Sequence, residues 1–324
     1  MKEKVPSTIS DQLELPVITA PMFLVSSPKM VIEACKSGII GSFPLLNART
    51  SEILEEWMKE ISDELSATKL KEPNRKVGPW AVNLVVHRSN KRYEEDLELV
   101  KKYQPPIIIT SLGDPSLVTD VVHEYGGLVF SDVIDLKYAK KAVQKGVDGL
   151  ILVCSGAGGH SGVINPFAFI SSVREFWDGI IVLAGSITNG NDILAAEALG
   201  ADLVFMGTRF IAATESMADE EYKKMVGEST FEDIIYTDVF SGVKANYLIP
   251  SIKKAGIDPD LLPDKKSIDF SEMNKSKAKA WRDIWSAGHG VTTIKKIQPV
   301  AEIVEELKKS YSDSLSSLIK NKRK

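Results

Sequence analysis

The chain has 324 residues, of which 44% are hydrophobic and 26% charged, enough for one large globular domain or a domain carrying an inserted subdomain. The net charge of −4 provides no general attraction to nucleic acid or to an acidic membrane surface. No apolar run approaches membrane-spanning length, and the polar N-terminal segment lacks a signal-peptide core, so we expect a cytoplasmic protein. The two cysteines, Cys35 and Cys154, lie in apolar segments, which predicts buried free thiols. The four histidines lack the spacing of metal ligands, so we expect no metal site.

Eight apolar segments of strand length alternate along the chain with amphipathic segments of helix length. The predicted strands lie within residues 16–22, 38–44, 80–86, 106–113, 127–133, 149–156, 180–187 and 202–211. The first seven are followed by predicted helices within residues 27–38, 50–65, 93–103, 115–126, 135–146, 167–177 and 191–200. Strands that are apolar on both faces are typical of parallel sheets covered by helices. The pattern predicts an α/β fold, a (β/α)₈ TIM barrel, with an open doubly wound sheet as the alternative.

The alternation breaks after the eighth predicted strand. Residues 212–280 contain short amphipathic pieces separated by Pro, Gly and Asp, which predicts a helical insertion covering the active site. The barrel would then comprise residues 1–211 and 281–324, with its last helix near residues 299–315.

Glycine-rich segments follow the predicted strands six, seven and eight, at the end of a barrel where active sites lie. The loops after strands seven and eight form the usual phosphate site of such barrels, because bare backbone N–H groups can surround an anion there. Gly185 and Ser186 would form one side of this site, and Gly207 and Thr208 the other. The alternative is that these glycines serve only turns and helix caps.

Three further side chains at predicted strand ends are candidates for chemistry. His160 follows two glycines and could act as a general base near neutral pH, although a structural histidine bonded to a carbonyl is the alternative. Met22 could lie along an aromatic ring or in the core. Asn83 is a polar residue within an apolar strand, so it must brace the backbone or meet a ligand.

These segments together resemble the nitronate monooxygenases, formerly called 2-nitropropane dioxygenases, which are FMN-dependent TIM barrels. The resemblance runs through "LPVITAPMF", "VNLVVH", "GVDGLILVCSGAGGHSG", "VLAGSITNGNDILAAEALGADLVFMGTRFIAATES" and "WSAGHGV". It implies that His160 is catalytic. It implies FMN as cofactor, contacted by Ala20, Pro21, Met22, Asn83, Gly158, Gly185, Ser186, Gly207 and Thr208.

The activity that the resemblance implies is oxidation of an alkyl nitronate, such as propionate 3-nitronate, with O2 to a carbonyl compound and nitrite. The partners would be a small nitronate or nitroalkane and O2, without nucleic acid or membrane; the oligomeric state stays open, with a homodimer as one candidate. Ser286 and Tyr247 are weaker candidates for substrate contact. The chain departs from the family where it has Ser131 and Asp132 in place of a frequent lysine or glutamine, so the physiological substrate stays open.

Three other functions compete with this one. An FMN-dependent enoyl-acyl-carrier-protein reductase using NAD(P)H has a similar histidine segment, but no basic patch for an acidic carrier protein stands out here. A barrel isomerase or aldolase acting on a sugar phosphate would need a lysine or paired carboxylates, and Asp132 is the sole acid at the predicted strand ends. A flavin-binding protein without turnover would not need His160.

Overall fold

Residues 4–262 and 281–321 are described by a computed structural model. Eight parallel strands form one sheet in the order β1-β9-β8-β6-β5-β4-β3-β2. A bridge between Ile18 and Ile40 brings its first and last strands together, which closes the barrel. The strands are β1 (Val17–Thr19), β2 (Gly41–Pro44), β3 (Trp80–Val85), β4 (Ile107–Ser111), β5 (Leu128–Val133), β6 (Gly149–Val153), β8 (Ile180–Ala184) and β9 (Leu203–Met206).

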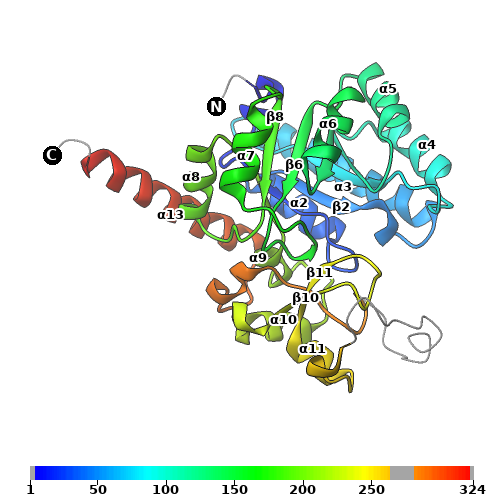
Figure 1. The fold of residues 1–324 in the computed structure, drawn as a ribbon. Coiled ribbons are helices and arrows are strands. Elements are labelled where there is room, and N and C mark those ends of the chain that lie inside the picture. The colour runs from blue at the N-terminus through cyan, green and yellow to red at the C-terminus, as the bar shows by residue number, and fades with distance from the viewer. Residues whose placement is uncertain (1–3, 263–280, 322–324) are drawn as a thin grey trace.

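Helices cover the outside of the barrel, as the alternating sequence pattern predicts (Figure 1). Seven of them connect successive strands: α2 (Pro28–Lys36), α3 (Ser51–Lys71), α4 (Tyr93–Tyr103), α5 (Ser116–Glu124), α6 (Leu136–Gln144), α7 (Pro166–Arg174) and α8 (Gly190–Leu199). The eighth, α13 (Val300–Asn321), packs against α8 and α2. The predicted TIM barrel is therefore confirmed, and the open sheet is excluded.

Side chains fill the barrel interior in layers, because alternate residues of each strand point inward. Ala81, Ile109, Phe130, Ile151 and Val182 belong to this interior cluster. Ile9 of the short helix α1 (Ser7–Ser10) joins the same cluster, so α1 closes the N-terminal end of the barrel. The opposite end, where the strands terminate, carries the polar residues described below.

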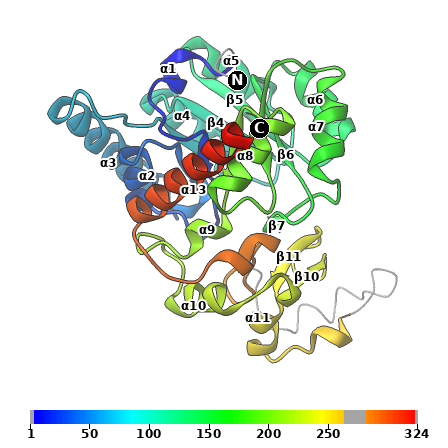
Figure 2. The same cartoon turned by 90° about the vertical axis from the view of Figure 1, so that its left-hand side faces the viewer.

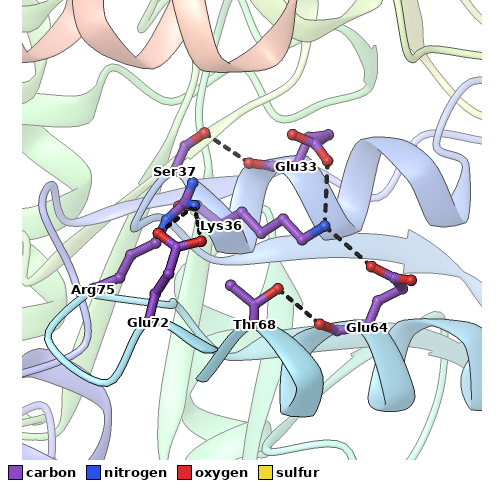
Figure 3. A network of polar contacts seen from close by, with 7 residues as sticks. All are labelled: Glu33, Lys36, Ser37, Glu64, Thr68, Glu72 and Arg75. Carbon is purple, nitrogen blue, oxygen red and sulfur yellow. Dashed lines mark hydrogen bonds and ion pairs between the residues drawn. The ribbon is translucent and has the colours of Figure 1, made fainter. Parts of the chain in front are cut away.

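The outward-facing strand residues form a second and larger cluster with the helices, which includes Met30, Leu54 and Ile303. Polar contacts between α2 and α3 lie at its edge (Figure 3). Lys36 Nζ is 3.2 Å from Glu64 and 3.7 Å from Glu33, and the Arg75 Nε donates to the Lys36 carbonyl at 2.8 Å. Exposed ion pairs add little stability, so the apolar contacts determine how these helices pack.

The chain between β9 and α13 forms a second layer against one end of the barrel (Figures 1 and 2). It contains α9 (Thr208–Ile211), α10 (Glu220–Glu228), α11 (Ile249–Lys254) and the 3₁₀ turns η2 (Phe231–Asp233), η3 (Pro259–Leu261) and η4 (His289–Thr293). The sequence predicts a helical insertion here; besides its helices and turns, this segment has a hairpin of β10 (Ile234–Thr237) and β11 (Ala245–Leu248). Residues 263–280 of the expected insertion lie outside the described residues.

The hairpin connects the insertion to the barrel. Strand β11 pairs antiparallel with β7 (Gly159–His160), a two-residue strand in the loop after β6, to form a three-stranded sheet. Ala245 is opposite His160, and Asn246 is opposite Gly159. The insertion is thus hydrogen-bonded to the loop that carries the candidate histidine. None of the helices in the described part of the chain is long and apolar enough to cross a membrane.

Candidate active site

Three neighbouring strands carry most of the residues predicted to contact the phosphate and the ring of FMN. Strands β1, β9 and β8 are adjacent, so the segments that follow them emerge side by side. A methyl group placed on Gly207 would lie 3.3 Å from the Ala20 Cβ and 3.4 Å from the Met22 Sδ. Pro21 lies between these two residues and is half-buried. The loops that carry Ala20–Met22 and Gly207 are therefore in direct contact.

Hydrogen bonds within the loop after β1, and from Asn47 to that loop, hold it in place. The Met22 amide donates to Ser26 Oγ at 2.9 Å, and the Leu24 amide donates to Asn47 Oδ1 at 2.9 Å. Asn47 Nδ2 donates in turn to the Met22 and Ser26 carbonyls. This buried asparagine fixes the loop in one conformation, with Met22 at the end of the barrel.

Ser186 has an unusual backbone for a residue with a side chain. Its φ is +58°, and the preceding Gly185 also has a positive φ, of 127°. Left-handed backbone at a non-glycine residue is uncommon and concentrates at functional sites. Ser186 is also exposed, which leaves this strained turn accessible at the end of β8.

The glycines after β6 allow the backbone of residues 286–290 to approach closely. A methyl group on Gly158 would lie 2.9 Å from the Gly288 amide nitrogen and 3.3 Å from Thr208 Oγ1. The Gly288 amide donates to Thr208 Oγ1 at 2.8 Å, and the His289 amide donates to the Gly156 carbonyl at 2.9 Å. Gly288 and His289, which make these contacts, were not predicted from the sequence, although the Gly-His pair in "AGHG" repeats the one at His160.

His160 is held in the second sheet, with its ring between the insertion and the chain after residue 280. Its Nε2 lies 3.0 Å from Ser241 Oγ. The Trp281 ring meets it edge-on, with ring centres 5.3 Å apart and planes at 82°. Burial lowers the pKa of His160, so the imidazole is neutral at pH 7 and can accept a proton.

A polar network lines the inner ends of three adjacent strands. Asn83 of β3 donates through Nδ2 to Ser111 Oγ at 2.7 Å and to the Ile109 carbonyl at 3.1 Å. Ser111 of β4 donates to Asp132 Oδ2 of β5 at 2.6 Å. Since Phe130 points into the barrel core, Asp132, two residues further along the strand, points inward at its open end.

Asp132 is the acid of this network, and its pKa is shifted. Its Oδ1 is buried without a hydrogen-bond partner among the described residues. Burial raises the pKa of Asp132 to about 6, and the hydrogen bond from Ser111 opposes that rise. A buried polar atom without a partner costs free energy unless a ligand or water satisfies it. This oxygen therefore fits a site built to contact a bound molecule.

The two weaker candidates of the sequence analysis are both buried. Ser286 Oγ also lacks a partner among the described residues, while its backbone carbonyl accepts a hydrogen bond from the Tyr222 hydroxyl. Tyr247 is 0% exposed, and its hydroxyl donates to Ser241 Oγ at 3.0 Å. Tyr247 thus reaches His160 through Ser241. Ser241 and Trp281, which contact His160, lie in no recognisable sequence motif and were not predicted.

The fold and the site together define a TIM-barrel protein with glycine-rich loops and a partly buried histidine at the carboxyl ends of the strands. The model of the family "Nitronate monooxygenase" matches residues 7–310. The chain belongs to the nitronate monooxygenase family. Members of this family are flavin-dependent oxidoreductases, and the chain is an enzyme of this class that acts in the oxidation of nitronates.

Individual relatives are distant but cover almost the whole chain. A nitronate monooxygenase from Paraburkholderia phytofirmans is 25% identical, over 94% of this chain and 94% of the relative. FabK from Thermotoga maritima has a similar fold, with a TM-score of 0.79 at 21% identity, covering 98% of this chain and 99% of FabK. A nitroalkane oxidase from Streptomyces ansochromogenes reaches a TM-score of 0.77 at 21% identity, covering 95% and 99%. At these identities the two solved structures support the fold alone.

Proposed function

We propose that this enzyme binds FMN and oxidises alkyl nitronates, such as propionate 3-nitronate, with O2 to a carbonyl compound and nitrite. The observation that carries the proposal is the position of His160, a neutral and partly buried base beside the glycine-rich loops at the carboxyl ends of the strands. The family match over residues 7–310 supports the same chemistry.

The residues present fit an FMN molecule. Gly185 and Ser186, together with Gly207 and Thr208, would hold the phosphate, because a glycine and a hydroxyl residue follow each of the adjacent strands β8 and β9. The ring would be contacted by residues on the neighbouring strand ends, namely Ala20, Pro21, Met22, Asn83 and Gly158. Bound FMN supplies the electron transfer between nitronate and O2, whereas the protein positions and shields the reactants.

His160 would perform the proton chemistry. With a neutral nitroalkane, it would remove the proton from the carbon that carries the nitro group. With a nitronate, which has already lost this proton, it would help hold the substrate. The insertion between β9 and α13 would cover the site, since its hairpin is paired with the strand that bears His160. Covering the site excludes water from the reaction.

The first test is the visible spectrum of the purified protein under anaerobic conditions, before and after addition of propionate 3-nitronate without nicotinamide. We expect a flavin spectrum that nitronate bleaches directly. A flavin that ignores nitronate and is bleached by NADH would refute the proposal in favour of an enoyl reductase. A protein without flavin that cannot bind added FMN would refute the cofactor assignment.

The His160→Asn variant tests the base separately from the cofactor. We expect it to bind FMN as the parent protein does, because the proposed phosphate loops lie elsewhere in the chain. Its turnover of neutral nitroalkanes should fall by about 100-fold or more, as for loss of a general base. Full turnover of neutral nitroalkanes by this variant would contradict the role of His160.

A further inference from the structure

One serine of the insertion connects His160 to the rest of the second sheet. Ser241 lies in the turn between β10 and β11, and pairing of β11 with β7 holds this turn beside His160. Ser241 Oγ is 3.0 Å from His160 Nε2, 3.0 Å from the Tyr247 hydroxyl and 2.9 Å from the Val243 carbonyl oxygen. Three polar groups therefore converge on a single hydroxyl.

The hydrogen-bonding capacity of a hydroxyl determines the direction of each contact. A serine hydroxyl has one proton to donate and two lone pairs that accept. The Val243 carbonyl can only accept, so it takes the Ser241 proton. Both lone pairs then remain for donors, which are the Tyr247 O–H and an N–H at His160 Nε2. A neutral imidazole carries only one N–H, so Nδ1 has none.

We propose that Ser241 is a positioning residue that holds His160 as the Nε2–H tautomer and leaves Nδ1 to receive the substrate proton. The catalytic part of this inference rests on the proposed function. When a neutral nitroalkane reacts, its C–H bond breaks and a new N–H bond forms at Nδ1, while the electron pair stays on the carbon and nitro group. The resulting imidazolium keeps its hydrogen bond to Ser241, so no partner has to reorient.

Aromatic packing fixes the ring plane that this arrangement needs. Trp281 meets His160 edge-on and also lies against Tyr247, with ring centres 5.4 Å apart. Phe240 packs edge-on against Tyr247 at 5.2 Å. These contacts hold the Tyr247 and His160 rings against Trp281, which restricts rotation of the imidazole.

The tautomer can be measured without any substrate. In protein labelled with ¹⁵N-histidine, an imidazole nitrogen without a proton resonates far downfield of the protonated one, and His160→Asn identifies the signals of residue 160 among the four histidines. We expect Nε2 to be the protonated nitrogen in the parent protein. In Ser241→Ala, which removes the acceptor, the two tautomers should become mixed, whereas Ser241→Thr should restore the parent spectrum.

Activity provides the second readout. Ser241→Ala should lower kcat/KM for a neutral nitroalkane by about 10- to 100-fold, the effect of losing a hydrogen bond to a charged group. It should leave kcat for the corresponding nitronate within about twofold, because that substrate needs no proton removal, whereas its KM should rise because His160 also helps hold the nitronate. Ser241→Thr should recover most of the loss. The matched control is Ser171→Ala on the exposed face of α7, which should change neither substrate.

The two proposals fail in different ways. If the parent protein has its proton on Nδ1, the inference is wrong whatever the activity. Equal losses of kcat for nitroalkane and nitronate in Ser241→Ala would also overturn it, because that result indicates general damage to the site. If the parent protein oxidises neither substrate but carries the proton on Nε2, the tautomer assignment stands and the proposed function fails.

Discussion

Replacement of Asp132 by asparagine should stabilise the protein at neutral pH. Asp132 Oδ1 is buried without a partner among the described residues, and burial raises the pKa of this acid from 3.8 to about 6. Each pKa unit corresponds to about 1.4 kcal/mol, so a rise of about two units costs at most about 3 kcal/mol of folding free energy above pH 6. Asparagine resembles the protonated acid and carries no charge, so it avoids this cost.

The sign of the pH dependence follows from proton binding. Below pH 3.8 Asp132 is protonated in both the folded and the unfolded chain, and it contributes nothing. Between pH 3.8 and about 6 the folded protein keeps a proton that the unfolded chain loses, so the free energy of unfolding falls as the pH rises. Above pH 6 the full cost is present. Asp132→Asn should abolish this part of the pH profile.

Urea unfolding followed by tryptophan fluorescence, at intervals between pH 4 and pH 8, measures the effect. The difference in unfolding free energy between Asp132→Asn and the parent protein should grow with pH and level off above pH 6. Asp120→Asn, on the exposed surface of α5, is the control and should leave the profile unchanged. Parallel profiles of the parent and Asp132→Asn, or a less stable variant at pH 8, would refute the reasoning.

Three further predictions concern packing and access. Gly288→Ala places a methyl group 2.5 Å from the Gly156 carbonyl oxygen, so thermal unfolding should show that the free energy of unfolding falls by about 1–3 kcal/mol. Gly227→Ala in α10 has open space around it and should raise the free energy of unfolding by about 0.5–1 kcal/mol, so equal effects of the two substitutions would contradict the close approach. Cys35 and Cys154 are buried, and burial raises the pKa of each thiol to about 12. A thiol reagent should therefore label them at pH 8 only as fast as the protein unfolds, and rapid labelling of the native protein would count against this packing. Tyr247→Phe and Tyr247→Ala should raise KM for nitronate, because the Tyr247 hydroxyl supports Ser241 beside His160; an unchanged KM in both variants would remove Tyr247 from the substrate site.

The barrel could be predicted from sequence because its signals are local. Each strand is a short apolar run. Several barrel helices begin at a side-chain cap, such as the Asn189 and Asp192 capping box of α8, and the order of the elements dictates a parallel sheet. Parallel strands end at one edge, so the glycine-rich loops had to meet there. Ala20, Met22 and Gly207 came into contact as this rule requires.

The second sheet could not be predicted in the same way. The segments "IIYT" and "ANYL" lie among turns and short helices, and they form a hairpin whose second strand pairs with β7. The Ser241–His160 contact joins residues 81 positions apart. No local pattern encodes such a pairing, because the free energy that selects it comes from side chains and backbone groups that meet only in the folded chain.

Sequence alone therefore determined the barrel, the loops at its open end and the histidine beside them, since these follow from periodicity and chain order. Tertiary structure decided the immediate surroundings of that histidine. Ser241 and Trp281 contact His160 from the insertion and from the chain after it, and Tyr247 contacts Ser241. The Asp132 Oδ1 atom is buried only when the strands assemble. Burial and hydrogen-bond partners set proton affinities, and both are properties of the assembled fold.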